Sequence, residues 1–430
     1  MPSRKRDAEP AASALDPAQF ALGDRRPKAA CAPASDAEVA RRLRECDAEG
    51  RAVVLFGGGT LQGLGHVPER YDLALSFARL DAVLEYEHRD LTIAVQAGCT
   101  VAALERRLAA HGQFVPLDAP RAATATVGGT LASGWLGPRR AAYGRPRDFA
   151  IGSTAVLADG TIAKSGGMVV KNSTGYDVTK LYLGSFGTLG AIVRANFKTL
   201  PMPASRRLAV ASLPEGTRAR ATAHIAALAL EPAAAVVVHG FENEIEGRDG
   251  IDGRILVLYE GSERLVDRAT RDLRSALGSA GVPETRLIDN GAGAAFARIV
   301  DAYLAALGAR SASYRSGGTP GDAHQRLDAF ARVARRNELA LESIEDLRTG
   351  DVIARLSADA DDAFAQRLLA FDGERRTALA QARVVVSPPS VRARLDAWGA
   401  PPSALAAMRT LKARFDPHRT LAPGRFVGGI

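Results

Sequence analysis

Cysteine is scarce in this chain of 430 residues. The three cysteines, Cys31, Cys46 and Cys99, are widely spaced and form neither a CxxC pair nor a cluster with histidine. This spacing argues against a disulfide framework and against the usual cysteine-ligated zinc or iron–sulfur centre. No metal site is therefore expected, and any redox chemistry of the chain requires an organic cofactor.

Long apolar runs are also missing. No stretch of about 18 uninterrupted apolar residues occurs, which argues against a transmembrane helix. Residues 1–23 contain three prolines and lack the apolar core of a secretory signal, so we expect a disordered N-terminal lead and a cytoplasmic protein. The net charge of +8 is spread along the chain among many acidic residues. That distribution favours a solvated arginine-rich surface over a nucleic-acid-binding face.

The elements predicted in the first 200 residues are mixed helices and strands. A helix is expected to begin after Ser35 and end near Gly50, because "SDAE" offers a serine cap with a glutamate three residues later. Residues 51–56 indicate a buried strand, and a second helix is expected between Thr100 and Gly112. This pattern is α+β and lacks regular βαβ alternation.

Beyond residue 200 glycine pairs become rarer and the expected strands and helices alternate more regularly, so we place a domain boundary there. Strands and helices then follow an order that fits a split-βαβ, ferredoxin-like sheet with helices on one face. The last residues, "MRTLKARFDPHRTLAPGRFVGGI", are expected to start as a helix and end in an extended tail.

Three consecutive glycines at 57–59 directly follow the expected strand. Gln62 stands where the third glycine of a Rossmann fingerprint belongs, and no GK[ST] follows, so neither a Rossmann nor a Walker A loop fits. Two interpretations remain: a glycine-rich turn, and a nest in which the N–H groups of residues 57–61 surround an anion. The density of glycine between residues 122 and 190 favours the nest.

Several motifs occur together and in order: "VVLFGGGT", "ATVGGTLASG", "SGGMVVKNSTGYDVTKL", "GSFGTLGA" and "PGRFVGG". With them the chain resembles the FAD-binding domain of the vanillyl-alcohol oxidase and p-cresol methylhydroxylase superfamily, and within it the FAD-binding subunit of bacterial glycolate oxidase. The resemblance implies a two-subdomain FAD-binding PCMH-type domain over residues 24–203. A ferredoxin-like FAD-linked oxidase cap domain is implied over residues 204–430.

The resemblance also implies which residues hold FAD. The glycine loop matches the family's pyrophosphate-binding loop, and "DAP" with "ATVGG" matches a second flavin-binding segment. Ile192 matches a position whose backbone holds the isoalloxazine or the ribityl chain. The full expected set is Gly57, Gly58, Gly59, Thr60, Leu61, Pro120, Thr126, Gly128, Gly129, Ser133 and Ile192. Thr60 stands where a histidine would allow covalent attachment, so FAD is expected to be bound non-covalently.

The cap departs from the family pattern. Catalytic relatives carry a histidine-rich "HxGDGNxH"-like segment there, often associated with a metal, whereas "LESIEDLRTGDVIARL" has no histidine and keeps only Gly350 and Asp351. No metal ligand and no catalytic residue are assigned on this basis. Arg139 and Arg140 have two interpretations. They bind an anionic substrate or the FAD phosphates, or they form a solvated basic turn. His66, just after the glycine loop, is expected to be structural.

The resemblance implies an FAD-dependent oxidoreductase acting on CH–OH groups, as the FAD-binding subunit of a glycolate (2-hydroxy acid) oxidase complex. Because the chain has no iron–sulfur cysteines, electrons are expected to pass to a partner iron–sulfur subunit, in a hetero-oligomer with a second flavin subunit. The missing cap histidines leave two alternatives open. One is a catalytically silent FAD-binding scaffold or electron relay beside an active paralogue, and the other is a stand-alone FAD-linked alcohol or sugar oxidase.

Overall fold

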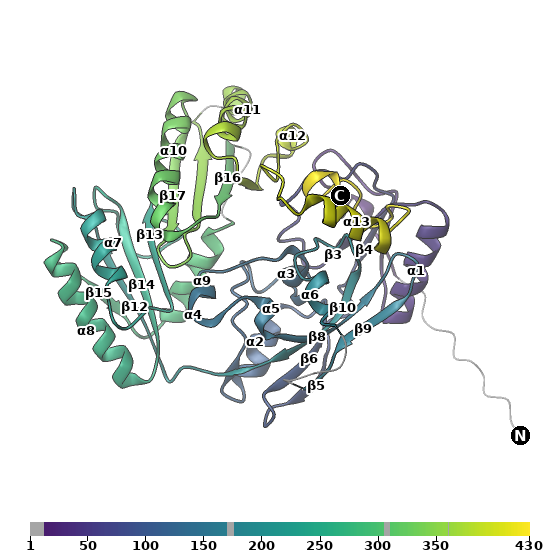
Figure 1. Cartoon of the computed structure of the whole chain (residues 1–430), viewed down its shortest axis with the longest axis horizontal. Coiled ribbons are helices and arrows are strands. Elements are labelled where there is room, and N and C mark those ends of the chain that lie inside the picture. The colour runs from purple at the N-terminus through teal and green to yellow at the C-terminus, as the bar shows by residue number, and fades with distance from the viewer. Residues whose placement is uncertain (1–12, 170–175, 305–309, 360) are drawn as a thin grey trace, which may run out of the picture.

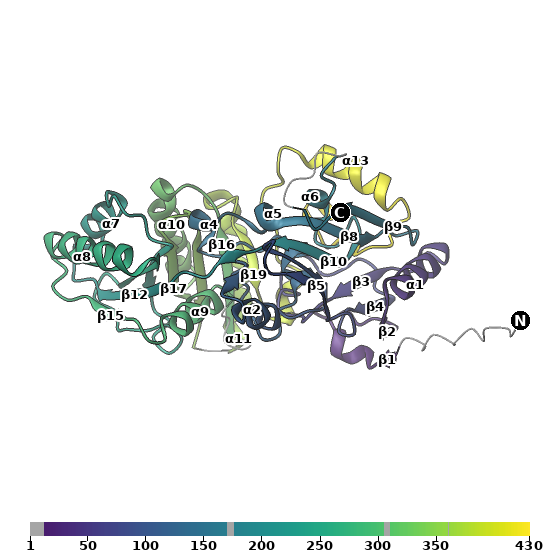
Figure 2. The ribbon, with the colours of Figure 1, turned by 90° about the horizontal axis from the view of Figure 1, so that it is seen from below.

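The computed structural model describes residues 13–169, 176–304, 310–359 and 361–430. The chain forms two lobes that lie side by side, with the N-terminal residues and the C-terminus in one lobe and an eight-stranded sheet in the other (Figures 1 and 2). No helix within the described ranges is long and apolar enough to cross a membrane. Part of the motif "SGGMVVKNSTGYDVTKL", residues 170–175, lies outside these ranges.

The first sheet of the N-terminal lobe has four strands in the order β1-β2-β4-β3. They are β1 (Ser13–Leu15), β2 (Ala29–Ala32), β3 (Val53–Phe56) and β4 (Leu73–Ser76). β2, β4 and β3 run parallel, and helix α1 (Asp36–Ala48) connects β2 to β3. As predicted, Ser35 caps α1, because its hydroxyl accepts the N–H of Glu38 at 3.2 Å.

The expected disordered lead is shorter than residues 1–23. β1 pairs antiparallel with β2, and residues Pro17–Phe20 form a short 3-10 helix. The reason is hydrophobic packing, since the ring of Phe20 meets the ring of Phe56 edge-on at 4.9 Å and Leu22 is buried beside them. Residues 1–12 are outside the described ranges.

A five-stranded antiparallel sheet forms the rest of this lobe, in the order β5-β6-β10-β8-β9. Its strands are β5 (Val83–Glu87), β6 (Thr92–Gln96), β8 (Ala150–Val156), β9 (Ile162–Gly166) and β10 (Ala191–Lys198). The helices are α2 (Val101–Ala109), α3 (Val127–Ser133), α4 (Arg140–Tyr143), α5 (Pro146–Phe149) and α6 (Thr179–Tyr182), and the short strands β7 (Gln113–Phe114) and β11 (Leu200–Pro201) pair with each other. Thr100 caps α2 as expected.

The second lobe is an eight-stranded antiparallel sheet made of two ferredoxin-like units. The first unit comprises β12 (Ser205–Ser212), α7 (Arg218–Ala226), β13 (Ala234–His239), β14 (Arg254–Gly261), α8 (Glu263–Ser279) and β15 (Arg286–Ile288). The second comprises β16 (Ser311–Ser316), α10 (Ala323–Arg336), β17 (Ala340–Asp346), β18 (Val352–Ser357), α11 (Asp361–Ala378) and β19 (Arg383–Val386). The strand order β15-β12-β14-β13-β17-β18-β16-β19 repeats one βαββαβ arrangement in mirror order, joined through β13 and β17.

Helices cover both faces of this sheet, not one as predicted. α7 and α8 pack on the outer face of the first unit, and α10 and α11 on that of the second. α9 (Ala292–Ala302) packs on the opposite, inner face because Phe296 and Ile299 join a core with Leu208 and Leu256. Leu64 and Trp135 of the first lobe belong to the same core, so the inner face is where the two lobes meet.

The C-terminal segment returns to the first lobe. After α12 (Pro389–Arg392), helix α13 (Leu405–Phe415) packs on the core of the five-stranded sheet through Leu411 and Phe415. Leu421 forms a parallel bridge with Val53, and the ammonium of Lys412 donates to the carbonyl of Thr188 at 3.0 Å. Residues 405–430, the end of the range predicted as the cap, therefore contact the lobe that carries the glycine loop. The helix followed by an extended tail is as predicted.

Candidate functional site

The glycine loop follows β3 and packs against the segment that precedes α3. A Cβ atom on Gly57 would lie 2.0 Å from the hydroxyl oxygen of Thr126, and one on Gly58 would lie 1.6 Å from the carbonyl oxygen of Thr124. Gly59 has a positive φ of 73°. The first two glycines are required by close approach and the third by its backbone conformation.

The backbone amides of this loop are free. None of the five N–H groups of residues 57–61 donates a hydrogen bond to another residue that the structure describes. Gly58 and Gly59 are exposed and the other three residues are half-buried, so these amides are open to a ligand, and successive free N–H groups are typical of an anion-binding nest.

The segment that packs against the glycine loop leads directly into helix α3. Its cap is Thr126, whose hydroxyl accepts the N–H of Gly129 at 3.2 Å. Gly128 lies against Ala97, where a Cβ atom would come within 2.6 Å of the alanine methyl group. The small residues of "TVGG" therefore let α3 pack close to the five-stranded sheet while the glycine loop packs on its N-terminal side.

One cavity of about 80 Å³, partly open to solvent, unites these segments. All the residues predicted to hold the cofactor line it except Pro120. They are Gly57, Gly58, Gly59, Thr60, Leu61, Thr126, Gly128, Gly129, Ser133 and Ile192. Pro120 is buried outside the lining, because the chain at Asp118–Ala123 borders a second cavity between the lobes.

Residues that were not predicted also line this cavity. Phe186 lines it with a positive φ of 58°, and its ring stacks on Phe426 and meets Trp398 edge-on. Gly187 and Gly190 belong to the same wall. Phe186 belongs to the motif "GSFGTLGA", and nothing in the neighbouring sequence indicated its backbone conformation.

Arg425 reaches the cavity from the C-terminal tail. It is 2% exposed and donates to the carbonyl oxygens of Leu64 at 3.0 Å and His66 at 3.2 Å. Arg392 donates to the carbonyls of Leu64 and Gly65, each at 3.0 Å. Burial and the neighbouring Arg392 lower the pKa of Arg425 to about 9, so it stays cationic at neutral pH. "PGRFVGG" was the signal for this residue, but its contact with the loop depends on the fold.

The two guanidinium groups behind the loop have no ion-pair partner among the described residues. They are held by neutral carbonyl groups, so their charge remains uncompensated, and Arg425 lies in the cavity lining. An uncompensated positive charge in a poorly solvated place favours an anion nearby. The free amides, the absence of side chains on the glycines and this charge together fit a diphosphate group.

Arg139 and Arg140 serve neither of their predicted roles. Arg139 is buried and pairs with Asp118 of its own lobe at 2.6 Å and with Glu260 of β14 at 3.2 Å. Arg140 pairs with Asp351 at 2.7 Å. Both therefore link the lobes by ion pairs, and neither lines the cavity. Neighbouring residues could not indicate these ion pairs, because Glu260 and Asp351 lie over 100 residues away in the chain.

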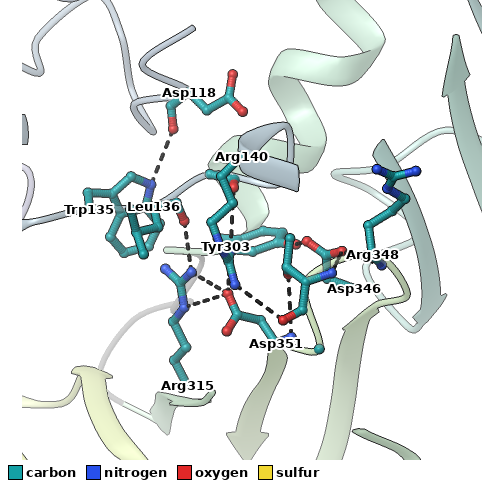
Figure 3. A network of polar contacts seen from close by, with 12 residues as sticks. Asp118, Trp135, Leu136, Arg140, Tyr303, Arg315, Asp346, Arg348 and Asp351 are labelled. Atoms are coloured by element: carbon teal, nitrogen blue, oxygen red, sulfur yellow. Dashed lines mark hydrogen bonds and ion pairs between the residues drawn. The ribbon is translucent and has the colours of Figure 1, made fainter. Parts of the chain in front are cut away.

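Figure 3 shows the ion-pair cluster around Asp351, in which Arg140 and Arg315 approach one carboxylate from opposite sides. The Asp351 carboxylate also accepts from Arg315 Nε at 3.1 Å, and the two guanidinium groups hold its pKa below the usual range against the effect of burial. Arg315 Nη2 donates to the carbonyl of Leu136 at 2.8 Å. Nearby, burial raises the pKa of Asp346 to about 6.

Histidine is absent from the described lining of the cavity, and so are carboxylates, cysteine and tyrosine. His66 is half-buried and contacts Arg425 through its backbone, while the ring of His111 stacks on His88 at the surface, with ring centroids 4.4 Å apart. Within the described ranges no three metal-ligating side chains gather. The cavity can hold a group through backbone donors, but its lining offers no general base.

Comparison with known proteins identifies the cofactor of the N-terminal lobe. Residues 27–166 match the family described as "FAD binding domain", so this part of the chain is an FAD-binding domain. The glycolate oxidase subunit GlcD of Bacillus subtilis (strain 168) is 35% identical over 185 residues, which cover 43% of this chain and 39% of that protein. The glycolate oxidase subunit GlcE of Escherichia coli (strain K12) is 32% identical over 192 residues, which cover 44% of this chain and 51% of that protein.

The chain thus spans about half or less of the length of these two relatives. The fold extends further than the sequence similarity. The crystal structure of p-cresol methylhydroxylase with substrate bound superimposes with a TM-score of 0.68 at 14% identity, covering 94% of this chain and 89% of that one. The α+β fold, with the FAD-binding domain and its cap, is therefore that of the p-cresol methylhydroxylase type.

Proposed function

We propose that this chain, an FAD-binding protein with the fold of p-cresol methylhydroxylase, is an FAD-dependent oxidoreductase of the glycolate oxidase type. Its substrate class is a small 2-hydroxy acid, oxidised at the CH–OH group. It acts in a hetero-oligomer with a second flavin subunit and an iron–sulfur subunit that receives the electrons. The names of the two glycolate oxidase subunits, together with the lack of iron–sulfur cysteines in this chain, support this assignment.

The observation that carries the proposal is the row of five free amides at residues 57–61 in a cavity whose walls come from the FAD-binding domain. These amides bind the FAD diphosphate, with Arg392 and Arg425 supplying positive charge from behind the loop. Thr126, Gly128, Gly129 and Ser133 form the opposite wall. The bound FAD would accept a hydride from the substrate.

The remaining residues position the cofactor and exclude water. Ile192, on β10, forms the buried floor, and Phe186 closes the side that faces Trp398 and Phe426. The lining contains none of the side chains that usually form covalent flavin bonds, histidine, cysteine or tyrosine, within the described residues. We therefore propose non-covalent FAD, held by the domain at residues 24–203 together with the C-terminal tail.

Reconstitution with FAD tests this proposal. The purified full chain, stripped of any flavin, is titrated with FAD while the quenching of flavin fluorescence and the absorbance spectrum are recorded. We expect saturable uptake of one FAD per chain, released on denaturation because no covalent bond forms. Protein that is folded by circular dichroism and takes up no FAD would sink the proposal.

A second function, a catalytically silent FAD-binding scaffold or electron relay, is favoured by one observation. The described lining offers no side chain able to take the hydroxyl proton, which oxidation of a 2-hydroxy acid requires. Anaerobic mixing of the FAD-loaded chain with glycolate and D-lactate separates the two functions. Bleaching of the flavin by the isolated chain supports the oxidase, whereas bleaching only in the presence of the partner subunits supports the relay.

A further inference from the structure

The inner face of the cap sheet carries an arginine without a partner. Arg383 on β19 stands directly opposite Arg315 on β16 in the antiparallel register, so both side chains lie on the same face. The guanidinium of Arg383 makes no hydrogen bond or ion pair with any residue that the structure describes. Like charges directly opposite each other destabilise a sheet, so this pair needs a compensating anion.

The cluster around these residues has too few carboxylates. Three guanidinium groups, those of Arg140, Arg315 and Arg383, face two carboxyl groups, those of Asp351 and Asp346. Asp351 already accepts from both Arg140 and Arg315. Asp346 is occupied by Tyr303 and by two backbone N–H groups. At least one positive charge is therefore left over, even with both carboxyl groups ionised.

Arg315 also has a hydrogen-bond donor without an acceptor among the described residues. Its Nη1 atom is buried and has no hydrogen-bond partner in the described part of the chain. In Figure 3 its other nitrogens point to Asp351 and to the carbonyl of Leu136. A buried guanidinium N–H without an acceptor is costly, and such groups occur where a ligand completes the set.

Arg315 and Arg383 do not line the proposed cofactor cavity, but two contacts connect their strands to the segments that do. Arg315 lies over the ring of Trp135 at 5.0 Å, and Trp135 follows α3, whose Ser133 lines the cavity. At the other end of β19, the carbonyl oxygen of Val385 packs closely on Gly63, just after the glycine loop. A Cβ atom added to Gly63 would lie 3.1 Å from that oxygen. Arg383 is only partly buried, so a small solute can reach it.

We propose that Arg383 and the free Nη1 of Arg315 bind the carboxylate of a small organic acid on the cap side of the cavity. A guanidinium pair binds a planar carboxylate through parallel N–H···O bonds, which neither chloride nor a neutral diol can reproduce. The identification of this acid as the substrate rests on the proposed function. The anion site itself does not depend on it.

The test measures binding, not turnover. Oxalate, glycolate, neutral ethylene glycol, chloride and inorganic phosphate are titrated by calorimetry into the full chain, once FAD-free and once FAD-loaded. The variants are Arg383→Gln, Arg383→Lys and, as a matched control, Arg271→Gln, which removes an exposed arginine from the outer helix α8. We expect oxalate or glycolate to bind, an affinity loss of about tenfold or more in R383Q, a smaller loss in R383K and no change in R271Q.

Melting temperatures provide an independent readout. Without ligand, R383Q should melt at or above the wild-type temperature because an unpaired charge is removed, whereas a structural arginine would lower it. Equal affinity in R383Q, a lower melting temperature, equally tight binding of chloride or phosphate, or no carboxylate binding at all would each overturn the site. Failure to take up FAD would refute the proposed function and leave the anion titration of the FAD-free chain as a separate result.

Discussion

The cofactor cavity and the ion-pair cluster around Asp351 lie close together but are built in opposite ways. The cavity presents backbone N–H groups and small residues from two short segments, 57–61 and 126–133. The cluster presents charged side chains from positions as far apart as Arg140 and Asp351. One is lined by backbone groups and small residues, with Arg425 as the charged side chain of its described lining, and the other is a set of charges that largely neutralise each other between two lobes.

This difference shows how each site responds to change. A backbone site has no side chain to remove and is disrupted by adding atoms, because its geometry depends on how closely segments approach. A site of buried ion pairs is disrupted by removing one partner, because the other charge then remains buried without compensation. The four predictions below test this contrast, in order of expected effect.

The largest effect is expected on the charged side, from Asp351→Asn. This change leaves Arg140 and Arg315 without their shared carboxylate, which is 5% exposed, and should lower the free energy of unfolding by about 3–5 kcal/mol. Asp289→Asn is the matched control, because Asp289 is 55% exposed and pairs with Arg207. Its cost should stay below about 1 kcal/mol. Urea unfolding of both variants measures the difference, and equal costs would abolish the contrast.

On the backbone side, Gly58→Ala should reduce the affinity for FAD by about a hundredfold or more, which is about 2.7 kcal/mol. The added methyl group would lie 1.6 Å from the carbonyl oxygen of Thr124, so the two walls of the cavity must separate. Gly278→Ala is the control, because that glycine has open space around its Cβ position in α8. FAD titration of both variants is the measurement, and unchanged affinity in G58A would show that the loop does not contact the cofactor.

The third prediction concerns pH and Asp346. Its pKa in the folded state is about 6, above its ordinary value of 3.8, so the folded protein holds this proton more tightly. Its contribution to stability is therefore lost as the pH rises from about 4 to about 6. Asp346→Asn removes this loss and should gain on the order of 1–3 kcal/mol relative to wild type between pH 4 and pH 7. Unfolding at several pH values measures it; a constant difference between the two proteins would contradict the assignment.

The smallest effect compares two helix caps. Thr126→Val and Thr100→Val each remove a hydroxyl that accepts a backbone N–H at 3.2 Å, and each should cost about 1 kcal/mol of stability. Only Thr126 lines the cavity, so only T126V should also weaken FAD binding, by a few fold. Parallel thermal unfolding and FAD titration separate the two effects. If T100V weakens FAD binding equally, the cap has no local role in the cavity.

The sequence predicted the features that depend on neighbours in the chain. The N-terminal caps of helices α1 and α2 and the strand before the glycine loop are as expected. The predicted cofactor residues share one cavity except Pro120, although their contact with FAD remains a prediction. Local patterns suffice here because caps, turns and glycine-rich loops are determined by a few adjacent residues.

The elements that the sequence did not predict are those whose role depends on distant partners. β12, α7, β15 and α9 were missed, and the second ferredoxin-like unit was not recognised as a repeat. In the same way, "GPRR" could not be assigned, because nothing near it in the chain indicates whether an arginine meets solvent, phosphate or a buried acid. Only the docking of the cap on the first lobe places Glu260 and Asp351 against it.

By itself, the sequence predicted a glycine loop directly after a buried strand and, with the second glycine-rich segment, favoured an anion-binding nest there over a plain turn. The tertiary structure decided which charges remain uncompensated. It brought Arg425 behind the loop through the returning C-terminal tail and set Arg383 opposite Arg315 in the cap sheet. The physical reason is that backbone conformation is a short-range property, whereas the balance of buried charge depends on every segment that the fold brings together.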